Sequence, residues 1–72
     1  MRDYHINIFF SEEDDCYVAD LPDFRYCSAF GATPEEALAE LTVARDAWLA
    51  DARERGDAVP EPRYRPLIYL AR

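Results

Sequence analysis

The sequence predicts an α+β fold in a single domain, and three observations support this. Apolar residues alternate along residues 4–10, which is typical of a half-buried strand. Residues 33–36 (TPEE) are of the types that begin a helix, and the apolar pattern after them has a helical period. A short apolar run, residues 67–71 (LIYLA), follows a proline-rich segment and is strand-like. The predicted order of elements is β-β-β-α-β.

Two strands and a hairpin are predicted in the first third of the chain. In residues 4–10, one face carries Tyr4, Ile6, Ile8 and Phe10, and the other carries His5, Asn7 and Phe9. Residues 11–15 (SEEDD) are polar and are expected to connect the strands. In the second strand, one face carries Tyr17, Ala19 and Leu21, and the other carries Cys16, Val18 and Asp20.

A third strand and a long helix follow. Pro22-Asp23 opens a turn, and the third strand is expected at residues 26–30, before Gly31. Thr33 is a good N-cap because its hydroxyl can accept from a free amide of the first turn, and Pro34 suits the first helical position. The helix is therefore predicted to begin at Pro34 and to end at Arg55, before Gly56.

The predicted helix has two apolar strips. One is expected to pack on the sheet, with Arg45 at its edge, and contains Ala37, Leu38, Leu41, Ala44, Trp48, Leu49 and Ala52. The outer strip contains small residues: Ala39, Val43, Ala47 and Ala50. This outer strip reflects either the helix propensity of alanine or a helix-to-helix contact in an oligomer.

The closing strand completes the predicted topology. Residues 57–66 contain three prolines, so no regular structure is expected there. Residues 67–71 would then lie parallel to the first strand, by the right-handed crossover rule. The prediction is a two-layer sandwich with strand order 3-2-1-4 and one helix on one face. The other face would expose Phe9 and Val18, which favours a partner or a second subunit.

Size and charge restrict the function. A chain of 72 residues forms one domain, residues 1–72, and its core is marginal for a monomer. A homodimer or higher homo-oligomer is therefore expected, with candidate contacts at Phe9, Val18, Ala39, Val43 and Ala47. The chain has 15 acidic and 8 basic residues, a net charge of −7 and no lysine. This balance disfavours direct nucleic-acid binding and favours a basic protein partner, although acidity also serves solubility alone.

Nothing in the sequence predicts catalysis, a metal or a cofactor. His5 is the only histidine, and no serine or cysteine has a recognisable nucleophile spacing. Two cysteines and one histidine fall short of a zinc site, and residues 12–15 lack the spacing of a calcium loop. Cys16 and Cys27 lie on neighbouring predicted strands, where pairing is conceivable. With no signal peptide and no apolar run near the roughly 18 residues of a membrane span, we expect a cytoplasmic protein with reduced thiols.

The order of short motifs resembles the HicB family of small bacterial antitoxins, in a UPF0150-like form without a second domain. The resemblance rests on residues 17–23 (YVADLPD), Cys27, residues 31–37 (GATPEEA), Gly56 and residues 60–62 (PEP). Arg25-Tyr26 departs from it, because the family usually has Pro-Gly there. The family's C-terminal DNA-binding domain is not expected in these 72 residues.

The resemblance implies a partial ribonuclease H-like fold and a HicA-type toxin as partner, a small basic ribonuclease that the antitoxin would occlude. The carboxylates that nuclease chemistry requires are missing from residues 67–71 and from the helix strip, so we expect no enzyme. Candidate partner-binding residues are Glu12, Glu13, Asp14, Asp15, Asp20 and Asp23. The alternative is a self-associating structural or regulatory module without a toxin partner, and a small hydrolase ranks below both.

Overall fold

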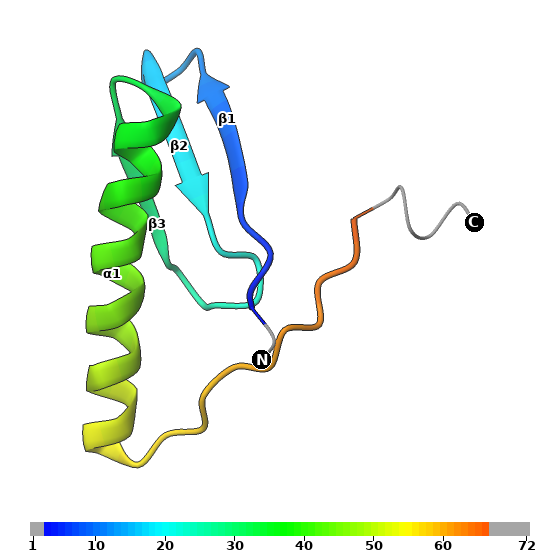
Figure 1. The fold of residues 1–72 in the computed structure, drawn as a ribbon, viewed down its shortest axis with the longest axis vertical. Coiled ribbons are helices and arrows are strands. Elements are labelled where there is room, and N and C mark those ends of the chain that lie inside the picture. Colours follow the sequence, from blue (N-terminus) through cyan, green and yellow to red (C-terminus); the bar gives the residue numbers. More distant parts are fainter. Residues whose placement is uncertain (1–2, 67–72) are drawn as a thin grey trace.

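The computed structural model describes residues 3–66. Its elements are β1 (Asn7–Ser11), β2 (Cys16–Asp20), β3 (Ser28–Gly31) and α1 (Pro34–Arg55), and Figure 1 shows the helix packed along one face of the sheet. The α+β class, with three antiparallel strands and one helix, is therefore as predicted. The predicted fourth strand, residues 67–71, lies outside the described residues.

The sheet is an antiparallel meander with the order β1-β2-β3. Its register places Phe9 opposite Val18, and Val18 opposite Phe30. These three residues face away from the helix, as their alternation with buried Ala19 and Ala29 requires.

Two strands begin later than predicted. β1 begins at Asn7 instead of Tyr4, and β3 begins at Ser28 instead of Tyr26. The second difference has a clear backbone cause, because Tyr26 has φ of 57°, outside the range of a strand. In the family pattern that the sequence resembles, glycine usually stands at the position of Tyr26. Glycine adopts a positive φ without strain.

The helix has the predicted bounds because its capping is local. The Thr33 Oγ1 accepts a hydrogen bond from the Glu36 amide at 3.1 Å, which satisfies a free donor of the first turn. At the other end Gly56 has φ of 74°, and its amide donates to the Arg53 carbonyl at 3.2 Å. A glycine is favoured at Gly56 because this left-handed conformation is strained for other residues.

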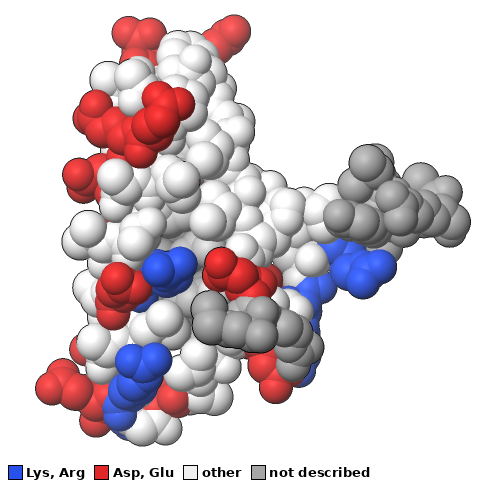
Figure 2. All heavy atoms as spheres, in the orientation of Figure 1, with Lys and Arg blue, Asp and Glu red and all other residues white. Residues whose placement is uncertain are grey.

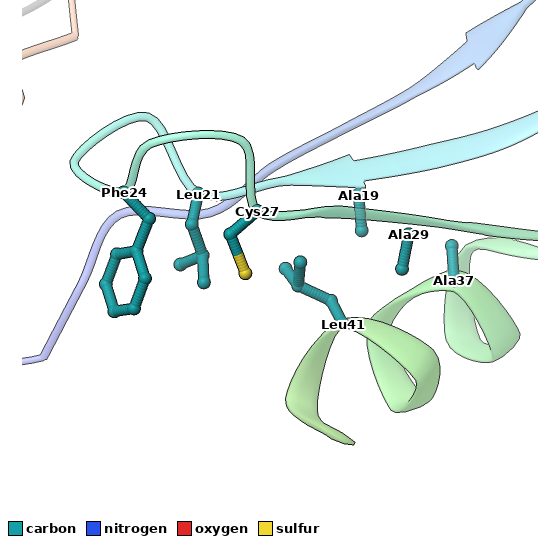
Figure 3. Packing of buried hydrophobic residues seen from close by; sticks show 7 residues of the cluster. All are labelled: Ala19, Leu21, Phe24, Cys27, Ala29, Ala37 and Leu41. Atoms are coloured by element: carbon teal, nitrogen blue, oxygen red, sulfur yellow. The ribbon is translucent and has the colours of Figure 1, made fainter. Parts of the chain in front are cut away.

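Small residues bring the helix close to the sheet in the core (Figure 3). Leu21 and Leu41 are its largest fully buried side chains, and the smaller members of the cluster are Ala19, Cys27, Ala29 and Ala37. A Cβ added at Gly31 would lie 2.4 Å from the backbone nitrogen of Ala37. Gly31 is therefore required by the close approach of β3 to the first turn of α1.

The helix covers β2 and β3 more than β1, which changes the predicted core (Figure 1). On the helix side of β1, Ile8 is 39% exposed and Phe10 is 49% exposed, although both belong to the predicted apolar face of this half-buried strand. Leu38 is also exposed, and Trp48 is only half-buried. Leu38 and Trp48 are therefore less buried than predicted, and a single helix is too narrow to cover the edge strand β1.

Residues 57–66, here called the strap, have no regular structure, as predicted, and Figure 1 shows them passing from the end of α1 to the N-terminal segment and then away from the sheet. The Tyr4 hydroxyl donates to the Pro60 carbonyl at 2.6 Å. Asp23 Oδ1 accepts hydrogen bonds from the backbone amides of Arg63, at 3.0 Å, and Tyr64, at 2.9 Å. Three hydrogen bonds thus attach the strap to the N-terminal segment and to the β2–β3 loop.

Candidate functional site

Acidic side chains from two elements meet at one end of the sheet. β1 runs towards the β1–β2 hairpin, and β3 runs the same way because both are antiparallel to β2. The first turn of α1 therefore lies at this hairpin end (Figure 1). We call the resulting surface the acidic pole: Glu12, Glu13, Asp14, Asp15, Glu35 and Glu36.

Among residues 3–66, no basic side chain lies at the acidic pole (Figure 2). All six of its residues are exposed, and residues 3–24 and 26–44 contain no lysine or arginine. Figure 2 shows acidic atoms without basic ones at the upper end of the molecule, whereas its lower half holds both acidic atoms and the described basic atoms. A surface with one sign of charge attracts partners of the opposite sign and raises the rate of encounter.

Local structure fixes the Asp14 carboxylate and is compatible with the other negative charges of the acidic pole. Ser11 Oγ donates to Asp14 Oδ2 at 2.9 Å and lies 3.3 Å from the Asp14 amide, while Asp15 takes a positive φ of 52°. Aspartate tolerates this conformation better than most residues, so the turn itself favours acidic side chains. Glu35 and Glu36 lie at the helix N-terminus, where the helix dipole stabilises negative charge.

The structure separates the six predicted partner-binding residues into two groups. Glu12, Glu13, Asp14 and Asp15 are together at the hairpin end, whereas Asp20 and Asp23 lie at the opposite end of β2, here called the loop end. Asp23 binds the strap through Oδ1, so this oxygen serves an internal contact. Glu35 and Glu36 were missed, although the antiparallel order of the strands places the helix start beside the hairpin.

A cavity of about 410 Å³ lies between the strap and the start of the chain at the loop end. Its walls include Asp3, Tyr4, His5, Asp23 and Tyr64. The rings of His5 and Tyr64 have centroids 4.5 Å apart, and His5 Nε2 hydrogen-bonds Asn7 Oδ1 at 2.8 Å. His5 is therefore half-buried and engaged in packing against Tyr64.

Asp23 has one oxygen that the strap does not use. Its Oδ2 is buried and has no hydrogen-bond partner among the described residues. A carboxylate oxygen buried in this way lowers stability, because its contacts with water are lost without replacement. Residues 3–66 contain no group of three or more His, Cys, Asp or Glu residues arranged to hold a metal ion.

The sheet face opposite the helix presents an uncharged apolar row. Phe9, Val18 and Phe30 lie side by side across the three strands, and Phe9 and Phe30 are 51% and 54% exposed. Val18 is only 8% exposed because the two rings flank it, so its predicted exposure to solvent was wrong. The other predicted oligomer contacts, Ala39, Val43 and Ala47, are exposed on the outer face of α1.

The two cysteines lie at opposite ends of the sheet. Cys16 begins β2 beside the hairpin, whereas Cys27 precedes β3 and belongs to the buried cluster. Both thiols are free, and their separation along β2 excludes the conceivable pairing. Burial raises the pKa of the Cys27 thiol, and nearby Asp20 raises it further, while Arg45 opposes the shift.

Together these features define a small α+β domain with an acidic pole and an apolar row across the sheet face opposite the helix. The chain is similar to a UPF0150 protein of Synechocystis sp., with 39% identity over 44 residues. The match covers 61% of this chain and 60% of the relative, and it supports the UPF0150 family. No family model matches the chain, and no solved structure matches it significantly. Within residues 3–66, no helix has the length and hydropathy of a membrane span.

Proposed function

We propose that this chain is a HicB-like antitoxin domain that binds a small basic HicA-type toxin and covers its RNA-binding surface. The observation that carries the proposal is the acidic pole, where six exposed carboxylates from two elements have no basic neighbour in their own segments. Similarity to a UPF0150 protein and the resemblance of the motifs to HicB antitoxins support it further.

The mechanism follows from electrostatics. An RNA-cleaving toxin needs a positive surface for phosphates, and the acidic pole competes for that surface. Exposed charges each add little binding energy, but their summed field accelerates association and is screened by salt. The antitoxin would therefore act by occlusion in the cytoplasm, with no chemistry of its own and no cofactor.

A charge-neutralised variant tests this role of the acidic pole. Glu12, Glu13, Glu35 and Glu36 would be replaced together by Gln, which leaves Asp14 and Asp15 to shape the turn. At low salt, association with the HicA-type toxin of the same genome should slow by about tenfold or more, because steering depends on summed charge. Stopped-flow fluorescence measures this rate, and inhibition of RNA cleavage by the toxin gives a second readout.

A matched control carries the same change of net charge away from the acidic pole. It replaces Asp46, Asp51, Glu54 and Glu61, which lie in the second half of α1 and in the strap, by their amides. When both variants are also compared at about 0.1 M salt, its association rate should stay within about twofold of the wild-type rate, because exposed charges more than about 10 Å from the contact are then screened. Equal slowing of both variants would contradict a specific acidic pole.

The apolar row of the sheet favours one alternative from another class, a self-associating module without a toxin. Phe9 and Phe30 expose apolar area on a face where Asp20 is the charged residue of the three strands, so two copies can approach there without strong repulsion. The same binding experiment separates the two functions. A chain that self-associates and binds no toxin would support the alternative.

A further inference from the structure

Tyr26 has a strained backbone and a side chain that is almost fully exposed to solvent. Its φ of 57° lies in the left-handed region, which crowds the Cβ of every residue except glycine. Its side chain is 94% exposed, so packing does not offset this strain. For the fold alone, tyrosine is therefore a poor residue at this position.

The surrounding loop fixes Tyr26 in this conformation. The Leu21 amide donates to the Cys27 carbonyl at 3.1 Å, and the Phe24 amide donates to the Leu21 carbonyl at 3.1 Å. From the helix, Trp48 Nε1 donates to the Arg25 carbonyl at 3.2 Å, immediately before Tyr26. These hydrogen bonds, with buried Phe24 and Cys27 on either side, make the loop a rigid support for a projecting ring.

We propose that Tyr26 is an anchor residue for the basic toxin, an inference that rests on the proposed function above. Strain is retained where a residue serves a purpose other than stability. A tyrosine ring offers a large contact area at low entropic cost, and its face attracts the cationic side chains of a basic partner. Residues of this kind dominate binding energy at protein interfaces.

The position of Tyr26 gives it a role distinct from that of the acidic pole. The two surfaces lie at opposite ends of β3, a strand of four residues that spans about 13 Å. A toxin the size of one small domain reaches both. Long-range charge governs the rate of encounter, whereas a desolvated aromatic contact governs the rate of escape. Tyr26 should therefore control dissociation, and the acidic pole should control association.

Three substitutions separate the ring from the backbone. Tyr26→Gly and Tyr26→Asn remove the ring and tolerate a positive φ, whereas Tyr26→Phe keeps the ring and the strain. The first two should raise the melting temperature of the free chain, by about 4 °C for glycine. Both should dissociate from the HicA-type toxin at least tenfold faster in surface plasmon resonance, with little change in association rate. Tyr26→Phe should resemble the wild type in both measurements.

The outcomes distinguish this inference from the proposed function. If the wild type binds the toxin and Tyr26→Gly dissociates at the wild-type rate, Tyr26 is not an anchor and the antitoxin function stands. If Tyr26→Gly lowers the melting temperature, the tyrosine serves the fold and the inference is wrong. If the wild type does not bind the toxin, the proposed function and this inference both fail.

Discussion

The hairpin end and the loop end of the sheet contain the same residue types, used in different ways. At the hairpin end Phe10 is 49% exposed, Asp14 bonds Ser11 within its own turn, and Cys16 is partly exposed. The hydrogen bonds of Asp14 thus join residues that are three positions apart in the sequence.

At the loop end the corresponding residues are buried or reach far along the chain. Phe24 is 5% exposed, with its ring 4.6 Å from that of Tyr4 and 4.9 Å from that of Trp48. Asp23 bonds the strap 40 residues away, and Cys27 is 4% exposed. The comparison teaches that the loop end stabilises the domain, which leaves the charges of the hairpin end available for a partner.

Replacing one phenylalanine at each end should give the largest difference in stability between the two ends. Phe24→Ala should lower the free energy of unfolding by about 3–5 kcal/mol, because it removes a buried ring that joins Tyr4 to Trp48. Phe10→Ala should cost about 1 kcal/mol, because half of that ring is already in water. Urea unfolding followed by circular dichroism measures both. Equal costs would mean that the two ends stabilise the domain alike.

Replacing one aspartate at each end should give a smaller difference in stability. Asp23→Ala should cost about 2 kcal/mol, since two strap amides lose a charged acceptor, whereas Asp14→Ala should cost about 0.5 kcal/mol. Asp23→Asn keeps an oxygen for the strap and removes the charge beside the unpartnered Oδ2 position. It should therefore be clearly more stable than Asp23→Ala in the same unfolding experiment. An Asn variant as unstable as the Ala variant would show that the charge, rather than the strap contact, is what matters.

Cysteine labelling gives the smallest difference, in a measurement that needs no substitution. At neutral pH, Cys16 should react with iodoacetamide at least about tenfold faster than Cys27, equivalent to about 1.4 kcal/mol. The reactive species is the thiolate, and burial both shields Cys27 and raises its pKa. Because its pKa is raised in the folded state, Cys27 favours folding at neutral pH, and this contribution is lost as the pH rises through that pKa. Peptide mass mapping follows both sites, and equal rates would show that the loop end opens readily.

The sequence predicts the parts of this fold that depend on neighbouring residues. The helix ends are correct because Thr33, Pro34 and Gly56 act within one turn of each boundary. The strand faces are largely correct because alternation is a local property, and the β1-β2-β3 order follows from short connections.

Features that depend on distant residues could not be predicted in this way. The start of β3 depends on the φ of Tyr26, which the loop contacts impose. The role of Asp23 depends on amides at positions 63 and 64. Four residues of the acidic pole, 12–15, were predicted because they are adjacent in sequence. Glu35 and Glu36 join them only through the topology of the fold.

The contact between Tyr4 and Pro60 has a consequence for the order in which the molecule assembles. It joins residues 56 positions apart, so the chain must close nearly its whole length before this hydrogen bond can form. Contacts of such long range cost the most loop-closure entropy and form late. The meander and α1 should therefore assemble first, and the strap should dock last and detach first. The side of the open pocket that the strap forms is then completed in the last step of folding.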